Sequence, residues 1–163
     1  MKIISIDPGY DRVGIAILEK SKNTHHKEIL LYSDCLVTSA KNIFTERLRL
    51  IGLKIEEIIQ QYQPTVMVIE SLFFNSNQKT VMLVSEAKGA IKYIALSHKL
   101  DIFEYTPLQI KIAITGYGRS SKQQVTAMVK KLIPLHKKIV YDDEYDAVAV
   151  GLTYFAINPV KKI

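Results

Sequence analysis

The sequence predicts an α/β fold in which helices pack against a mixed sheet. Short apolar runs rich in β-branched residues recur along the chain and are typical of buried strands. Longer stretches with apolar residues at helical spacing separate the later runs. The resulting order is three strands, helix, strand, helix, strand and further helices, which favours the α/β class.

The first three strands follow one another closely. Residues 2–7 form an apolar run that stops at the turn Pro8-Gly9. Residues 13–19 and 27–37 form the next two runs, and the polar segment 21–27 supplies the hairpin between them. We therefore expect three antiparallel strands in a row.

Two later strands are shorter. Residues 65–70 read TVMVIE, a run that predicts a buried parallel strand, and residues 101–106 form another. If strand 65–70 lies beside strand 2–7, their carboxyl ends meet at one edge of the sheet, which is where open α/β sheets bind ligands.

Helical spacing of apolar residues predicts the remaining elements. The clearest case is residues 42–62, where Leu48, Ile51, Ile55, Ile58 and Ile59 repeat with helical periodicity and Pro64 follows the end. Gly89 lies inside a long predicted helix and suggests close packing against another helix, because a glycine there is otherwise unfavourable. The further predicted helices span residues 75–99, 108–114, 121–133 and 143–157.

Composition describes an ordinary globular protein with a moderate basic excess. The 163 residues suffice for one domain, which we expect over residues 1–158 with a short basic tail at 159–163. The net charge of +6 suits a phosphate-backbone partner, but a basic protein without such a partner is an equally open alternative. One cysteine, Cys35, excludes an internal disulfide and a cysteine-based zinc site. No secretory signal or membrane-length apolar run is seen, so we expect a cytoplasmic protein with no membrane partner.

Four acidic residues at three places suggest a metal site. Asp7 and Glu70 end predicted strands. Asp143 and Asp146 lie three residues apart at the start of a predicted helix, so both face the same side of that helix. At ~5 Å and an effective dielectric of ~20, each like-charge pair would cost about 3 kcal/mol, which a divalent cation would cancel. Oxygen-only ligands select hard cations such as Mg²⁺. Carboxylates that hold two such ions are suited to phosphodiester hydrolysis.

Each acid also has a purely structural explanation. Acidic residues near a helix N-terminus, as at Asp142, Asp143 and Asp146, are favoured by the helix dipole. Asp7 before Pro-Gly is compatible with a simple turn. Glu70 is harder to explain in this way, because glutamate is disfavoured in strands. The combination of all four favours a functional cluster.

Four sequence blocks resemble those of a known family. They are IDPGYDRVGIAIL, VIESLFF, SSKQQVTAMV and DEYDAVAV, and in this order and spacing they resemble the RuvC family of Holliday junction resolvases over nearly the whole chain. The resemblance implies a single ribonuclease H-like domain, with helices on both faces of its sheet, and a homodimer. It also implies paired symmetric nicks in four-way DNA junctions that leave 5′-phosphate and 3′-hydroxyl ends. Two Mg²⁺ ions per site are implied, for which Mn²⁺ can substitute, with RuvA and RuvB as partners.

The resemblance also assigns site residues. Asp7, Glu70, Asp143 and Asp146 match the family's four catalytic metal ligands. Asp142 is adjacent to Asp143, and we prefer Asp143 because it keeps the Asp-x-x-Asp-Ala spacing.

Other residues match DNA-binding positions or are suggested by their charge. Phe73 matches an aromatic residue that stacks on junction bases, although a core role at a corner is the alternative. Lys111 and Lys122 match basic residues that lie near the scissile phosphate in the family. Without this resemblance, both would be interpreted as solvent-exposed lysines of helices. Weaker candidates for contacts with the DNA backbone are Arg119, Lys79, Lys88 and Lys92.

Three other functions compete with the resolvase. The first is the related family of ribonuclease H-like proteins that process ribosomal RNA, whose start resembles Asp7, Gly9 and residues 12–14. The second is an actin-like ATP-binding fold, which consists of two such domains, whereas 163 residues are enough for only one. The third is a junction-binding scaffold without activity, which four acids disfavour because uncompensated carboxylates repel phosphate.

Overall fold

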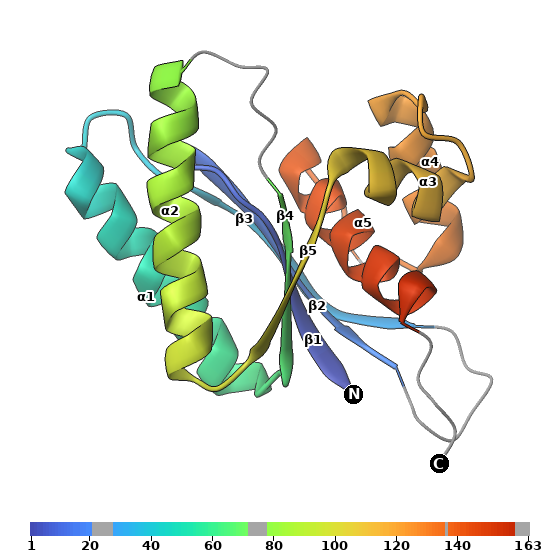
Figure 1. Cartoon of the computed structure of the whole chain (residues 1–163), viewed down its shortest axis with the longest axis horizontal. Helices are drawn as coiled ribbons and strands as arrows, with labels where there is room; N and C mark the ends of the chain where they lie inside the picture. The colour runs from blue at the N-terminus through green and yellow to red at the C-terminus, as the bar shows by residue number, and fades with distance from the viewer. Residues whose placement is uncertain (21–27, 72–77, 136, 159–163) are drawn as a thin grey trace.

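The computed structural model describes residues 1–20, 28–71, 78–135 and 137–158. These form one five-stranded sheet in the order β3-β2-β1-β4-β5, with helices on both faces (Figure 1). The strands are β1 (Lys2–Asp7), β2 (Arg12–Glu19), β3 (Ile29–Val37), β4 (Val66–Glu70) and β5 (Asp101–Tyr105). The helices in the described residues are α1 (Phe44–Tyr62), α2 (Gln78–Ser97), α3 (Pro107–Thr115), α4 (Lys122–Leu132) and α5 (Asp142–Ile157). The mixed sheet, the helices on both faces and the single domain confirm the predicted class.

The strand pairing brings β1 to the centre of the sheet. β1 pairs antiparallel with β2, where Asp7 faces Gly14, and β2 pairs antiparallel with β3. On its other side β1 runs parallel to β4, with Ile6 paired to Ile69. The predicted parallel neighbours are therefore confirmed, and the next residues along, Asp7 and Glu70, lie side by side.

Alternation along β1 separates two apolar cores. Ile4 and Ile6 point to the layer of α1 and α2, where they pack with Ile51 and Ile91. Residues of the opposite face pack instead against α5 and its neighbours α3 and α4. Figure 1 shows these two helix layers on either side of the sheet. The central strands β1, β2 and β4 are thus buried on both faces, which fixes them rigidly.

Close contacts seat α5 directly on the sheet. The buried hydroxyl of Ser5 donates a hydrogen bond of 2.7 Å to the carbonyl oxygen of Ala147. A Cβ atom added at Gly14 would lie 1.9 Å from the carbonyl oxygen of Asp143. Because only a glycine permits this approach, the first turn of α5 sits against β2 at a fixed position.

A buried arginine holds the turn that follows β1. Arg47 of α1 donates from Nε to Thr38 Oγ1 at 2.9 Å and from Nη2 to the carbonyl oxygen of Tyr10 at 3.1 Å. It also forms an ion pair with Asp11, and its guanidinium lies 4.7 Å from the centre of the Tyr10 ring. These contacts anchor the turn beyond Asp7 to α1.

Differences from the sequence-based expectations are small. Helix ends shift by one or two residues, for example α5 begins at Asp142 rather than at 143. Gly89 is a correction: a Cβ there would meet no atom within 4 Å, so it does not pack against another helix of this chain. The predicted hairpin 21–27, the helix start at 75–77 and the tail 159–163 lie outside the described residues. None of the helices in the described ranges is long and apolar enough to cross a membrane.

Gly14→Ala tests the seat of α5. The added methyl group must displace the backbone of Asp143, so we expect a loss of about 1–3 kcal/mol in the free energy of unfolding, measured by urea denaturation. Gly52→Ala is the matched control, because its Cβ would meet only the flexible tip of Ile94 at 3.3 Å. Equal stability of the two variants would contradict this packing.

Candidate active site

Four acidic side chains from three elements gather at the carboxyl ends of the central strands. β1 ends at Asp7 and β4 at Glu70, while Asp143 and Asp146 lie in the first turns of α5. Burial raises the pKa of Asp7 well above its ordinary value, and the charges of Glu70, Asp146 and Asp143 raise it further. The four side chains therefore lie within electrostatic reach of one another.

Asp7 and Glu70 form the inner half of this cluster. Burial raises the pKa of Glu70, while a hydrogen bond with Asp7 lowers it. Burial and the charge of Glu70 raise the pKa of Asp7, so this buried pair retains a proton at a pH where a free aspartate has lost it. Among the ion pairs of the described residues, none involves either carboxyl group.

Asp143 and Asp146 form the outer half, and each has a cationic partner. Asp143 Oδ2 lies 3.3 Å from Nε of Arg12, the first residue of β2. Asp146 Oδ2 lies 2.8 Å from Nζ of Lys122, the first residue of α4. The side chain of Asp142 is 69% exposed and its Oδ2 lies 3.8 Å from the same Nζ, whereas the side chain of Asp143 is only 20% exposed. The structure therefore favours Asp143 over Asp142 as the cluster member.

Local structure explains the position of Lys122. Ser121 caps α4, because its Oγ accepts from the N–H of Gln124 at 3.3 Å and the Gln124 side chain accepts from the N–H of Ser121 at 2.8 Å. Burial lowers the pKa of Lys122, but its hydrogen bond and ion pair with Asp146 outweigh this and leave the pKa above its ordinary value. Lys122 is therefore positively charged beside the cluster.

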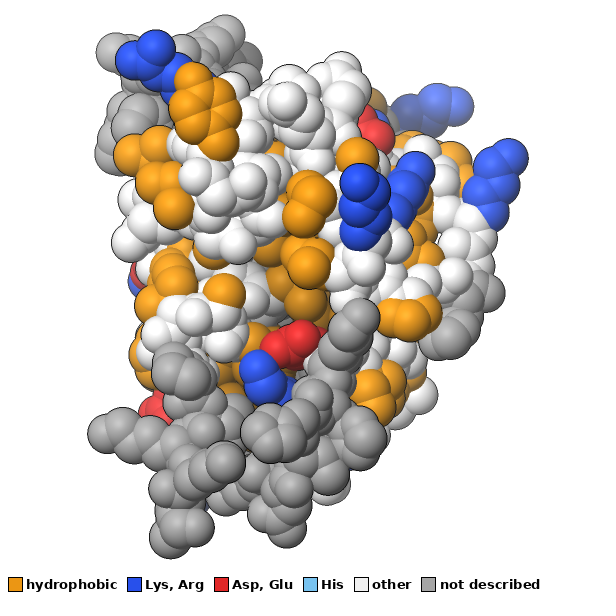
Figure 2. All heavy atoms as spheres, turned by 90° about the vertical axis from the view of Figure 1, so that its right-hand side faces the viewer, with side chains coloured by type: hydrophobic (Ala, Val, Ile, Leu, Met, Phe, Trp, Pro, Cys, Tyr) orange, Lys and Arg blue, Asp and Glu red, His pale blue; other side chains and the backbone are white. Residues whose placement is uncertain are grey.

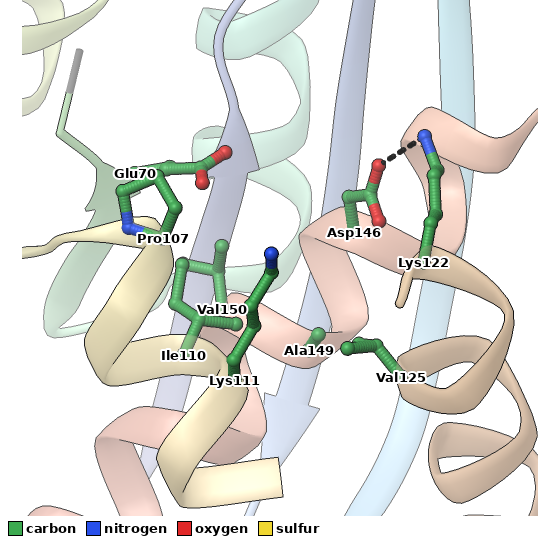
Figure 3. Close-up of a pocket in the computed structure, with 9 residues that line it drawn as sticks. All are labelled: Glu70, Pro107, Ile110, Lys111, Lys122, Val125, Asp146, Ala149 and Val150. Atoms are coloured by element: carbon green, nitrogen blue, oxygen red, sulfur yellow. Dashed lines mark ion pairs between the residues drawn. The ribbon is translucent and has the colours of Figure 1, made fainter. Parts of the chain in front are cut away.

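A pocket of about 260 Å³ opens between the acids and helices α3, α4 and α5. Glu70 and Asp146 lie on opposite sides of it, and the side chain of Lys111 on α3 rises between them (Figure 3). Apolar side chains form the floor, namely Pro107, Ile110, Val125, Ala149 and Val150. The pocket thus places two lysines next to two of the acids.

Comparison with known proteins identifies the family. The family model described as crossover junction endodeoxyribonuclease RuvC matches residues 3–154. The chain belongs to the RuvC family. RuvC of Alkaliphilus metalliredigens is 41% identical over 154 residues, which cover 94% of this chain and 92% of that protein. RuvC of Finegoldia magna is 40% identical with the same coverage.

Solved structures agree with this family. RuvC of Thermus thermophilus in complex with a Holliday junction substrate aligns with a TM-score of 0.88 at 26% identity, covering 96% of this chain and 94% of that one. The same enzyme in a second structure aligns at 0.85. The yeast mitochondrial resolvase Ydc2 aligns at 0.69 with 11% identity and shows the fold alone. The ribonuclease H-like fold of the RuvC family is therefore confirmed.

The RuvC family consists of metal-dependent nucleases, and the acidic cluster fits a metal by its chemistry. All four donors are carboxylates, which suit a hard divalent cation, and their mutual repulsion is what such a cation relieves. Yet in the part of the chain that the structure describes, no three acidic, histidine or cysteine side chains form a ready-made metal cage. The four carboxylates are near one another, but they do not converge on a single position.

Other residues that the RuvC resemblance suggested have varied surroundings. Arg119 is exposed in the turn between α3 and α4. Lys88 is buried and lies 2.6 Å from Glu104, which Lys92 also contacts at 2.5 Å. Both lysines therefore have a partner inside the protein, which disfavours a direct contact of Lys88 with DNA. Phe73 lies outside the described residues, and so does the side chain of Lys79.

Sequence reasoning missed Arg12 as a member of the site. Its guanidinium contacts Asp143 and lies 5.7 Å from the centre of the Tyr141 ring. No local pattern could reveal this contact, because it depends on α5 being seated against β2.

Asp7→Asn tests the raised pKa in the metal-free protein. The folded state retains a proton on Asp7 that the unfolded chain releases above about pH 4, so the stability of the wild type should fall as pH rises beyond that value. Asparagine removes this cost. At pH 7.5 we expect its melting temperature to exceed the wild-type value by ~2 °C or more, with the difference shrinking toward pH 4.

Melting curves in EDTA across this pH range provide the measurement. Asp101→Asn is a suitable control, because Asp101 is exposed at the start of β5. A pH-independent difference between Asp7→Asn and the wild type would show that Asp7 is not protonated as described.

Proposed function

We propose that this protein is a Holliday junction resolvase, a metal-dependent endonuclease that nicks four-way DNA junctions. The observation that carries the proposal is the convergence of Asp7, Glu70, Asp143 and Asp146 beside two lysines, in a chain of the RuvC family. The junction-bound relative, which aligns over nearly the whole chain, supports the substrate. Family membership favours this function over ribosomal RNA processing, ATP binding or a scaffold without activity.

The basic surface supports a phosphate-backbone partner. Figure 2 shows the side of the molecule on which α3, α4 and α5 lie, where Lys and Arg side chains gather at one edge. Independently of that view, α4 carries Lys122 in its first turn and Lys130 and Lys131 in its last turn. Phosphate contacts of this kind supply most of the non-specific affinity for DNA.

The acids would hold the metal ions, and the lysines would hold the phosphate. Two Mg²⁺ ions per site, or Mn²⁺ in their place, would activate water and stabilise the leaving oxygen when bound. Asp7 must release its proton to act as a ligand, and Glu70 beside it would complete the inner pair. Lys111 and Lys122 line the same pocket and would neutralise the scissile phosphate. Cleavage would leave 5′-phosphate and 3′-hydroxyl ends.

A homodimer would supply paired symmetric nicks. We propose that the open face of α2 around Met82, Leu83 and Ala90 forms the contact. Met82 is exposed there and Leu83 and Ala90 are half-buried, while Gly89 leaves room for a close approach. Tyr93 and Leu96 extend the same exposed face. Two sites related by a two-fold axis match the symmetry of a four-way junction.

Partners and location follow from this function. We propose RuvA and RuvB as the junction-binding and helicase partners, on the basis of family membership. A cytoplasmic location is proposed because the proposed substrate is a junction in cellular DNA.

Cleavage of a labelled synthetic four-way junction tests the function directly. Linear duplex, single strand and RNA–DNA hybrid are the comparison substrates, each with Mg²⁺ and with EDTA. We expect paired nicks only in the junction, only with metal, and a loss of at least ~10³-fold with Glu70→Gln, which removes a proposed metal ligand. Glu70→Gln should still bind the junction in EDTA at least as tightly as the wild type, because it removes a charge that repels phosphate.

Glu57→Gln is the matched control, because Glu57 is an exposed acid on α1 whose ion-pair partner among the described residues is Lys54. It should cut like the wild type. Preferential cleavage of RNA, or junction cleavage by Glu70→Gln at the wild-type rate, would contradict the proposal.

Tyr93→Arg tests the dimer face. Tyr93 is 73% exposed on α2, and two arginines brought together across a two-fold axis should dissociate the dimer at micromolar concentration. Leu108→Arg is the control, since Leu108 is 55% exposed on α3, on the opposite face of the sheet. Sedimentation velocity should show monomers for the first variant and dimers for the second. A wild-type monomer that still cleaves junctions would refute the dimer.

A further inference from the structure

The outer acids of the cluster carry counterions that belong to the protein. Arg12 comes from β2 and Lys122 from α4, so two separate elements each deliver one cation to one carboxylate. The inner acids, Asp7 and Glu70, form no ion pair of this kind in the described part of the chain. Charge neutralisation is thus concentrated on the outer pair.

We propose that Arg12 and Lys122 are exchangeable counterions of the metal site. In the metal-free protein they neutralise Asp143 and Asp146. With a divalent cation held by Asp143 and Asp146, Arg12 and Lys122 would be released and would turn to the phosphate of the DNA. This inference rests on the proposed function, and it adds Arg12 to the residues that serve it.

Exposure supports the exchange. The side chains of Arg12 and Lys122 are 49% and 51% exposed, whereas those of Asp143 and Asp146 are only 20% and 25% exposed. The cations therefore cover the acids from the solvent side and can leave without opening the core. A half-exposed ion pair contributes little net stability, so a divalent ion at the carboxylates can replace it.

Lys88 shows the contrasting case of a fixed cation. Its side chain is only 10% exposed and its ammonium lies 2.6 Å from Glu104, so leaving this partner would strand a nearly buried charge. Lys122, by contrast, is 51% exposed and can leave its partner without such a cost.

Once displaced, the side chains of Lys122 and Arg12 can each make another contact near the site. Lys122 lines the same pocket as Lys111, whose side chain rises between Glu70 and Asp146 (Figure 3). The guanidinium of Arg12 already lies 5.7 Å from the centre of the partly exposed Tyr141 ring, which can retain it after Asp143 is released. Metal binding would then convert two acid-bound cations into phosphate-binding cations.

The proposal also explains why the acids do not form a ready-made cage among the described residues. While Arg12 and Lys122 are bound, Asp143 and Asp146 are directed toward separate partners. Removal of either cation should therefore favour metal binding while it harms DNA cleavage.

Titration calorimetry of the metal-free full chain with Mn²⁺, without DNA, tests the exchange. Lys122→Met and Arg12→Gln should each bind Mn²⁺ at least ~3-fold more tightly than the wild type, because the metal no longer competes with a counterion. At saturating Mn²⁺ we expect each variant to cleave the junction at least ~10-fold more slowly.

Lys111→Met is the matched control. Lys111 lines the same pocket but forms no ion pair with an acid among the described residues. Its loss therefore changes only the long-range electrostatic potential at the four acids. Its effect on Mn²⁺ affinity should be clearly smaller. If Lys122→Met and Arg12→Gln bind Mn²⁺ no more tightly than Lys111→Met, the exchange is refuted.

Failure of the proposed function would look different. A wild type that binds no Mn²⁺, or a Glu70→Gln variant that binds it normally, would refute the metal site itself. Normal wild-type Mn²⁺ binding and junction cleavage, with unchanged Mn²⁺ affinity in Lys122→Met and Arg12→Gln, would refute only the exchange. The two Mn²⁺ titrations are independent, so misfolding of one variant leaves the other to decide.

Discussion

The parallel pairing of β1 with β4 is the constraint on which the site depends. It places Asp7 beside Glu70 at the carboxyl edge of a sheet whose central strands are buried on both faces. Two carboxyl groups in this setting cannot both stay charged in the absence of a cation, and the raised pKa of Asp7, caused first by burial and then by Glu70, is the result. The fold thereby creates an electrostatic cost that a bound metal ion would remove.

The surrounding elements complete and hold this arrangement. Arg47 fixes the turn beyond β1, and Gly14 lets the start of α5 approach the sheet closely enough to bring Asp143 into the cluster. The capped start of α4 presents Lys122 to Asp146. Stability and function conflict here, because the same repulsion that attracts metal lowers the stability of the metal-free fold.

Much of this could be predicted from the sequence, because periodicity and turn residues are local signals. They located the strands, the parallel neighbours and the four acids. The contact of Arg12 with Asp143 and the burial of Lys88 against Glu104 could not be predicted, since both depend on how distant elements pack. Gly89 misled for a related reason: a glycine in a helix indicates room for a close approach, but not that another helix of the same chain fills it.

Anomalous diffraction from crystals grown with Mn²⁺ would test the central claim most directly, because it locates metal ions without reference to activity. We expect peaks between the inner pair, Asp7 and Glu70, and the outer pair, Asp143 and Asp146, with Lys122 withdrawn from Asp146. Peaks elsewhere, or ordered Mn²⁺ with the Lys122–Asp146 ion pair intact at its present 2.8 Å, would contradict the account.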